Sequence, residues 1–243
     1  MTSDATVPAT PRARFREMMR EDILTAARRI LQQEGYPALS MRALAEAVGA
    51  RAPTLYDYFA SKEDVLNAIF KQGVELLAAQ FAALTEHTEP GLDRMMRLGI
   101  EYRRWGLANP DMYQLIFGRI DQSYVPGIEQ QTAAAALFQT LTNHVADSMN
   151  LGELAPQDPA MTAMTIWSMT HGFVSLELFG MAEKCGTAPP DDQFAFVLST
   201  LLYGLINRDA SGAPAAQPPS LAQVLSHTNA KDGMIVTTDA RNV

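Results

Sequence analysis

The chain has 243 residues, of which 47% are apolar and 8% aromatic, enough to bury the core of one large or two small domains. Its formal net charge of −8 argues against a protein that binds nucleic acid over its whole surface. The sequence contains no run of about 18 apolar residues and no apolar segment typical of a signal peptide near its start, so we expect no membrane span.

The charge is distributed unevenly along the chain. Residues 1–62 carry nine Lys and Arg against seven Asp and Glu, whereas the remainder carries ten against twenty. The basic residues concentrate at Arg12, Arg14, Arg16 and Arg20. A basic patch on an acidic body is typical of a protein that touches DNA with one end, although a solvated basic face gives the same pattern.

Composition also indicates the fold class. Ala, Leu and Met dominate and favour helices, and we find no period-2 run of β-branched residues, so we predict an all-α fold. The single cysteine, Cys185, excludes an internal disulfide and favours the reducing cytoplasm as the location.

In chain order, residues 1–11 are rich in Thr, Ala and Pro and are expected to form a disordered arm. The arginines from Arg12 to Arg16 extend this arm toward phosphates or a minor groove, or simply make it soluble. A first helix is predicted from about Arg16 to Glu34, with apolar residues on one face, and Gly35 ends it.

Residues 40–62 predict two short helices joined by a tight turn. Ser40 suits an N-cap, and the Ala- and Leu-rich stretch 41–48 favours a helix. Gly49 supplies the left-handed residue that ends this helix, and Pro53 fits only the first turn of a second helix, expected from Ala52 to about Phe59. Such a unit is a helix-turn-helix, whose second helix enters the DNA major groove.

The residues of this unit resemble the DNA-binding domain of the TetR/AcrR (tetracycline-repressor) family. The resemblance rests on Leu44–Gly49, on Thr54-Leu55-Tyr56-x-Tyr58-Phe59, and on Ser61-Lys62-Glu63-x-Val65-Leu66. The sequence departs from the usual pattern at Arg51, where the family more often has a capping Ser, and at Tyr58, which replaces a frequent His. The alternative is a helical hairpin without a role in DNA binding.

The resemblance implies the DNA-binding residues. Family positions that contact phosphates correspond to Arg42, Thr54, Tyr56, Tyr58 and Lys62, and those expected to face bases are Arg51, Ala52 and Asp57. The whole predicted DNA-binding set is Ser40, Met41, Arg42, Arg51, Ala52, Pro53, Thr54, Tyr56, Asp57, Tyr58 and Lys62.

The resemblance also sets the expected domains: a helix-turn-helix domain at 12–60 and a helical regulatory and dimerisation domain at 61–208. From Asp209 the composition shifts to Ala, Pro, Ser, Gly and Asn, which predicts a disordered or loosely docked tail at 209–243. Residues 234–238 are the only candidate for a short strand. Beyond residue 60 we predict helices at about 61–84, 92–107, 109–118, 126–150, 159–181 and 191–207.

The middle of the chain is rich in Met and aromatic residues and predicts a small-molecule site. Trp167-x-x-x-His171-Gly172 resembles a Trp/His-Gly signature in a subset of the family. We expect an apolar or amphipathic effector, with Arg103 or Arg104 available for an acidic group. The alternative is that these side chains only fill the core. The expected lining is Tyr102, Trp105, Tyr113, Phe117, Trp167 and His171.

The resemblance implies a homodimer, and the broad apolar stripe of helix 191–207 suits a helix that meets both the core and a partner chain. Burial within one subunit is the alternative. The predicted interface residues are Phe179, Phe194, Val197, Leu198, Leu201 and Leu205.

An enzyme is the rival class of function. His87, His144, His171 and His227 are scattered and lack metal-ligand spacing, and neither a nucleophile elbow nor a phosphate loop is present. We therefore expect no catalytic residue, metal or cofactor. A helical interaction module without DNA binding would leave the tyrosines near Lys62 without a role. The best hypothesis is a repressor released from operator DNA by a small molecule.

Overall fold

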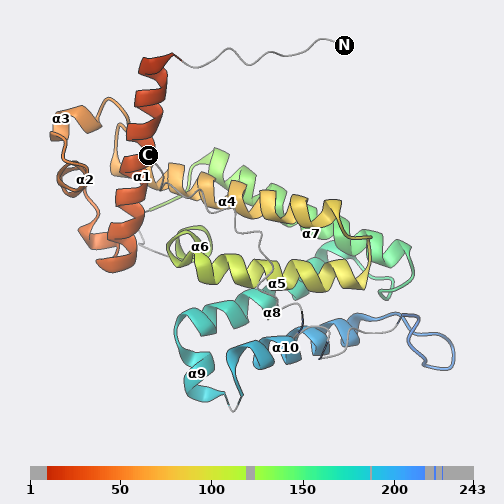
Figure 1. Cartoon of the computed structure of the whole chain (residues 1–243). Coiled ribbons are helices and arrows are strands. Elements are labelled where there is room, and N and C mark those ends of the chain that lie inside the picture. The colour runs from red at the N-terminus through yellow and green to blue at the C-terminus, as the bar shows by residue number, and fades with distance from the viewer. Residues whose placement is uncertain (1–9, 119–123, 187, 217–221, 223–225, 227–243) are drawn as a thin grey trace, which may run out of the picture. The chain divides into compact units, whose positions relative to one another are not determined.

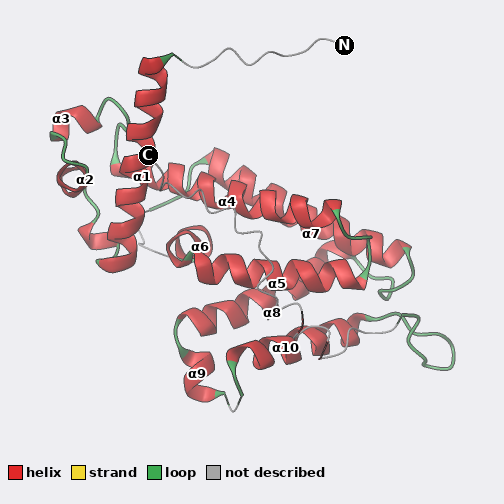
Figure 2. Ribbon diagram, viewed as in Figure 1, coloured by secondary structure: helices red, strands yellow, loops and turns green. Residues whose placement is uncertain are grey.

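The computed structural model describes residues 10–118, 124–186, 188–216, 222 and 226. This part of the chain consists of helices joined by loops, without a strand, which confirms the all-α prediction (Figures 1 and 2). The helices are α1 Pro11–Gln33, the 3-10 helix η1 Tyr36–Ala38, α2 Met41–Ala47, α3 Ala52–Leu55, α4 Lys62–Glu86, α5 Leu92–Ala108, α6 Pro110–Phe117, α7 Ile128–Asn150, α8 Pro159–Leu178, α9 Met181–Cys185 and α10 Pro190–Leu205.

Helix α1 begins five residues earlier than the expected start at Arg16. Thr10 is its N-cap, with the Oγ1 atom accepting a hydrogen bond of 3.2 Å from the Ala13 amide, and Pro11 occupies the first turn. A capping hydroxyl followed by proline is a strong start signal. The arginines that we assigned to the end of a disordered arm are therefore helical.

Helix α3 is shorter than expected, because it ends at Leu55 and not near Phe59. The next amides bond three residues back: Asp57 to the Thr54 carbonyl at 3.2 Å and Tyr58 to the Leu55 carbonyl at 2.9 Å. These bonds tighten the chain into a turn, as is common at the end of a helix.

The single helix expected at 159–181 is two helices. Helix α8 ends at Leu178, and Gly180 then adopts a left-handed conformation with φ of +69°. Its amide bonds to the Glu177 carbonyl at 2.8 Å, and α9 follows at once. We missed this break because Gly180 lies within an otherwise continuous apolar pattern.

The beginning of the expected disordered tail is ordered. The Asp209 amide bonds to the Ala213 carbonyl at 2.9 Å, and the Ala215 amide bonds to the Asn207 carbonyl at 2.8 Å. The candidate strand at 234–238, His227 and the arm before Thr10 lie outside the described residues.

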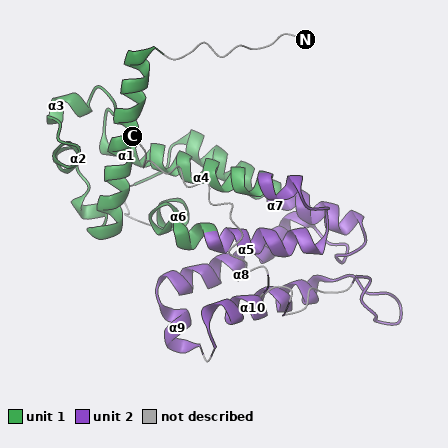
Figure 3. Cartoon of the chain, in the orientation of Figure 1, with its two compact units in different colours: residues 1–82, 105–140 green, residues 83–104, 141–243 purple. Residues whose placement is uncertain are grey.

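The chain forms two compact units (Figure 3). Unit 1 comprises residues 1–82 and 105–140, and unit 2 comprises residues 83–104 and 141–243. Each has its own apolar core. Buried residues of unit 1 include Ile23, Leu44, Leu55, Phe59, Leu66, Ile69, Trp105 and Met112, and those of unit 2 include Met95, Met96, Val145, Leu154, Val174, Phe194, Leu198 and Leu202. These compact units differ from the predicted domains, a DNA-binding domain at 12–60 and a regulatory domain at 61–208, which were defined by function. The functional boundary at residue 60 stays a prediction.

Candidate nucleic-acid interface and regulatory residues

Hydrogen bonds fix both ends of α2, and those at its second end form the turn that leads to α3. The Ser40 Oγ atom accepts a bond of 3.1 Å from the Ala43 amide, so Ser40 caps α2. At the other end Gly49 has φ of +65°, with its amide bonded to the Glu46 carbonyl and the Ala50 amide bonded to the Ala45 carbonyl. This pair of bonds is a Schellman motif, which requires a left-handed residue.

Two buried side chains anchor α3 and the turn that follows it. Leu55 is 1% exposed and Phe59 is 3% exposed. The predicted DNA-contacting side chains around them face outward: Arg51, Pro53, Thr54, Tyr56 and Asp57 are exposed, and Ala52 and Tyr58 are half-buried. Arg51 occupies the N-cap position without a side-chain capping bond, so its guanidinium is not used to start the helix.

The start of α4 and the start of α2 supply the other predicted contacts. Ser61 accepts a bond of 3.2 Å from the Asp64 amide and so caps α4 at Lys62. The Lys62 Nζ atom lies 4.0 Å from the centroid of the Tyr36 ring, a cation–π contact that holds the ammonium group in place. On α2, Arg42 is exposed and Met41 is half-buried.

Arg16 and Arg20 on α1, expected only as members of the basic patch, also brace this segment. The Arg16 Nη2 atom donates to the Asp57 carbonyl at 2.9 Å, and the Arg20 Nη1 atom donates to the Tyr58 carbonyl at 3.4 Å. Their spacing of four residues was a visible signal of a shared helix face. It could not reveal the partners, which lie about forty residues later in the chain.

The predicted effector-lining residues fall into two groups, one in each unit. In unit 2 the Tyr102 hydroxyl lies 3.0 Å from the His171 Nδ1 atom and accepts a bond of 3.4 Å from Trp167 Nε1. Burial lowers the pKa of His171 below its ordinary value. The imidazole is therefore neutral at neutral pH and has one donor and one acceptor nitrogen.

In unit 1 three aromatic rings form the other group. The ring centroid of Trp105 lies 6.3 Å from those of both Tyr113 and Phe117, and the last two are 5.4 Å apart. Trp105 is 1% exposed, and its Nε1 atom is buried without a hydrogen-bond partner among the described residues. A buried N–H left in this state costs about 1–3 kcal/mol.

Arg103 is not available for an acidic ligand, which corrects the expectation. Its Nη2 atom lies 2.6 Å from both Glu177 Oε1 and Asp191 Oδ1, so the guanidinium is already paired within unit 2. Arg104 lies 3.8 Å from Glu101. Glu177 is thereby the ion-pair partner of Arg103.

The predicted dimer residues lie on different sides of α8 and α10. Phe194 and Leu198 are 0% and 1% exposed and pack inside unit 2, where Leu198 closely approaches Gly99. They have no area left to bury against a partner. Leu201 is also buried, Val197 and Leu205 are half-buried, and Phe179 is 67% exposed.

None of the helices in the described part of the chain combines the length and the apolar composition that a membrane span needs. Nor does that part of the chain contain a group of three or more His, Cys, Asp or Glu side chains arranged to hold a metal ion.

Comparison with known proteins identifies the family. Residues 23–69 match the family model described as bacterial regulatory proteins, tetR family, and residues 95–201 match the model described as tetracyclin repressor-like, C-terminal domain. The Trp/His-Gly subset stays a prediction.

Individual relatives agree. The chain is 26% identical over 208 residues to the HTH-type transcriptional regulator Rv0681 of Mycobacterium tuberculosis, covering 84% of this chain and 89% of the relative. It is 27% identical over 168 residues to the HTH-type transcriptional regulator UidR of Escherichia coli, covering 64% and 80%. A TetR/AcrR-family regulator of Thermobifida fusca superposes with a TM-score of 0.60 at 25% identity, covering 76% and 97%. The chain therefore belongs to the TetR family and is a DNA-binding transcriptional regulator.

Proposed function

We propose that this regulator is a homodimeric repressor that is released from its operator by an amphipathic small molecule. The observation that carries the DNA-binding part is the arrangement around α3: two buried anchors, Leu55 and Phe59, with polar side chains turned outward between them. In this proposal Arg42, Thr54, Tyr56, Tyr58 and Lys62 contact phosphates, and Arg51, Ala52 and Asp57 face bases.

Repression is tested with a reporter whose promoter overlaps the operator. Expression of the wild-type chain is expected to lower transcription, because a bound dimer blocks polymerase. An increase in transcription would show an activator.

The Lys62→Ala variant tests the phosphate contacts. We expect weaker binding to every DNA sequence alike and a fall of about 1 in the slope of log affinity against log salt for each bound protomer. Fluorescence anisotropy over a salt titration measures the slope. Lys71→Ala is the matched control, since Lys71 is an exposed cation later on α4 that pairs with Glu129 at 2.8 Å. A wild-type slope for Lys62→Ala would remove Lys62 from the interface.

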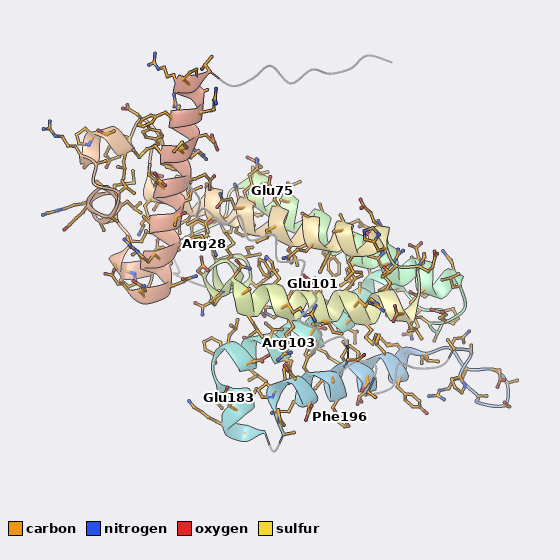
Figure 4. The ribbon with its side chains drawn as sticks, viewed as in Figure 1. Arg28, Glu75, Glu101, Arg103, Glu183 and Phe196 are labelled. Carbon is orange, nitrogen blue, oxygen red and sulfur yellow. The ribbon has the colours of Figure 1, made fainter. Side chains whose placement is uncertain are left out.

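The outward face of α8 and α10 supports a dimer. Met161 and Leu176 on α8 and Phe179 directly after it are 68%, 53% and 67% exposed, and Phe196 and Tyr203 on α10 are 63% and 49% exposed. Phe196 lies on the outer side of α10 (Figure 4). Exposed apolar side chains gathered on one face mark an interaction surface.

Two glycines allow close approach of a partner helix at this face. A Cβ atom added to Gly172 on α8 or Gly204 on α10 would have no neighbour within 4 Å. Small residues of this kind let two helices pack closely. In a two-fold contact both subunits present the same face, so bulky residues of one subunit can pack near the glycines of the other.

A Leu176→Glu/Phe196→Glu variant is expected to be monomeric, because the two carboxylates would be buried without partners in the dimer. Sedimentation at micromolar concentration measures the oligomeric state. Ile128→Glu is the control, because Ile128 is an apolar residue of α7 in unit 1 that is 85% exposed and is not one of the proposed interface residues. Sedimentation of the wild type as a monomer, with and without DNA, would contradict the dimer.

The effector part of the proposal is supported by polar atoms among aromatic side chains. Trp105 offers a buried N–H without an acceptor among the described residues, beside the rings of Tyr113 and Phe117 in unit 1. A ligand with an apolar body and a carbonyl or hydroxyl oxygen suits these groups.

Linkage tests regulation directly. A screen of amphipathic carbonyl compounds by thermal shift supplies the probe, and calorimetry then measures its affinity with and without operator DNA. A coupling of about 1–3 kcal/mol would weaken ligand binding about 5- to 150-fold when operator is present. Equal affinities would show a ligand that does not regulate.

A further inference from the structure

We propose that the first turns of α1 form a second DNA-binding element, in which Arg12 contacts a phosphate while Arg16 and Arg20 hold the segment after α3. This inference rests on the proposed operator binding, because it adds a contact to the same DNA. The three residues are called the arginine stripe below. The matched helix-turn-helix model begins at residue 23, so the stripe precedes the part of the chain that the family defines.

The spacing of the stripe places it on one side of α1. Arg12, Arg16 and Arg20 are four residues apart, and residues at this spacing share a helix face, with a rise of about 6 Å between neighbours. Arg16 and Arg20 reach the end of the recognition segment, which comprises α3 and the turn at residues 56–59. Arg16 donates to the Asp57 carbonyl and Arg20 to the Tyr58 carbonyl, at 2.9 and 3.4 Å.

Ring contacts strengthen this bracing. The Arg20 guanidinium carbon lies 4.3 Å from the centroid of the Phe59 ring, and that of Arg16 lies 5.8 Å from the Tyr58 ring. Both arginines therefore already have partners in the protein. Their role is to fix the turn at residues 56–59 against α1, which makes them positioning residues.

Arg12 differs from the other two members of the stripe. It is exposed, and it has no hydrogen-bond or ion-pair partner among the described residues. It lies one helical turn beyond Arg16, so the stripe continues past the carbonyls that Arg16 and Arg20 bind. The cap at Thr10 and the proline at residue 11 keep Arg12 within the helix. A flexible arm would lose backbone entropy when it binds DNA, whereas Arg12 is already held in a helix and avoids this cost.

Charge identifies the partner. The nearest acidic side chains on α1 are on other faces: Glu17 is five residues from Arg12, and Glu21 bonds to Gln72 at 3.1 Å. Arg12 thus adds positive charge beside a segment whose exposed residues already include Arg51. A polyanion seated on α3 and extended along α1 meets both arginines, and duplex DNA is such a polyanion.

The test compares Arg12→Ala with Arg29→Ala, which removes an exposed arginine from the other half of α1. Binding to an operator duplex and to a scrambled duplex is measured by anisotropy from 50 to 200 mM salt. Arg12→Ala is expected to weaken binding to both duplexes by the same factor. It is also expected to lower the slope of log affinity against log salt concentration by about 0.9 per protomer. For each Arg12–phosphate contact, raising the salt from 50 to 200 mM therefore lowers the affinity of the wild type about 3.5-fold more than that of the variant. Arg29→Ala is expected to match the wild type.

A wild-type slope for Arg12→Ala would overturn the proposal, while failure of the wild type to bind either duplex would overturn the proposed function itself. The positioning role has its own readout. Arg16→Ala is expected to lower the ratio of operator to scrambled affinity, because the recognition segment shifts, whereas Arg12→Ala leaves this ratio unchanged. Arg16→Lys, which keeps a donor for the Asp57 carbonyl, is expected to restore most of the ratio. An unchanged ratio in Arg16→Ala would remove the positioning role.

Discussion

Replacing Arg103 by leucine is expected to lower the free energy of unfolding by about 3–5 kcal/mol, because it leaves a buried carboxylate without its partner. The Arg103 side chain is 6% exposed and that of Glu177 is 11% exposed. Arg103 Nε and Nη2 donate to the two Glu177 oxygens at 2.7 and 2.6 Å, a bidentate pair. Burial lowers the pKa of Arg103, but the hydrogen bonds and charges of Glu177 and Asp191 outweigh this effect and raise it above the ordinary value.

Urea unfolding measures the loss, and Arg97→Ala is its control. Arg97 is also on α5, but it forms an exposed pair with Asp93 four residues away, which contributes about 0.3–0.5 kcal/mol. An Arg103→Leu/Glu177→Leu variant is expected to recover most of the stability, because Asp191 is 44% exposed and remains solvated. If Arg103→Leu were no more destabilising than Arg97→Ala, Glu177 would have found another partner or water.

A second large effect is expected from Arg28→Leu, which removes the partner of Asp111 within unit 1. The Asp111 side chain is 0% exposed and that of Arg28 is 29% exposed, with the Arg28 Nε atom 2.6 Å from Asp111 Oδ2. Gln32 also donates to Asp111 Oδ1 at 2.7 Å. Loss of the cation leaves a fully buried carboxylate with an amide only, so we expect a destabilisation of about 3 kcal/mol or more.

Arg29→Ala is the control for this variant, since it removes the neighbouring arginine of α1, which is exposed. Asp111→Asn is expected to cost less than Arg28→Leu, because it leaves no buried carboxylate without a cation. The Asn oxygen in the Oδ1 position still accepts from Gln32 and from Arg28 Nη2, at the cost of the bond that Arg28 Nε donates to Oδ2. The reverse order would show that the Asp111 carboxylate is satisfied without the Arg28 cation, and that its main role is to accept hydrogen bonds. Figure 4 labels Arg28 on α1.

The helix-turn-helix was predictable because its signals are local. Ser40 and Gly49 act on atoms within five residues, and the bonds of both are present as expected. The same local logic extends to the start of α1, which we placed too late by overlooking Thr10 and Pro11. The predicted α3 was too long for a different reason. The turn after Leu55 is made by bonds from the Asp57 and Tyr58 amides to carbonyls three residues back, and no glycine or proline in the sequence signals it.

The regulatory part was less predictable because its decisive contacts are distant in sequence. Arg103 was expected to be available for a ligand, yet its partners lie 74 and 88 residues away. The apolar pattern of α10 likewise indicated a broad stripe, but it did not show which of its residues are buried in the core and which are exposed. Burial assigns Phe194 and Leu198 to the core and leaves Phe196 exposed.

Selection of bound fragments from a random DNA pool with the full chain tests whether the protein binds DNA sequence-specifically as a dimer. We expect enrichment of two-fold symmetric sites, with half-sites about one DNA turn or a multiple apart. We also expect Arg51→Ala to change the base preference at one position of each half-site, since an Arg–guanine contact contributes about 1–3 kcal/mol of discrimination. A pool with no enriched sequence, from a wild-type chain that is folded, would contradict a sequence-specific regulator.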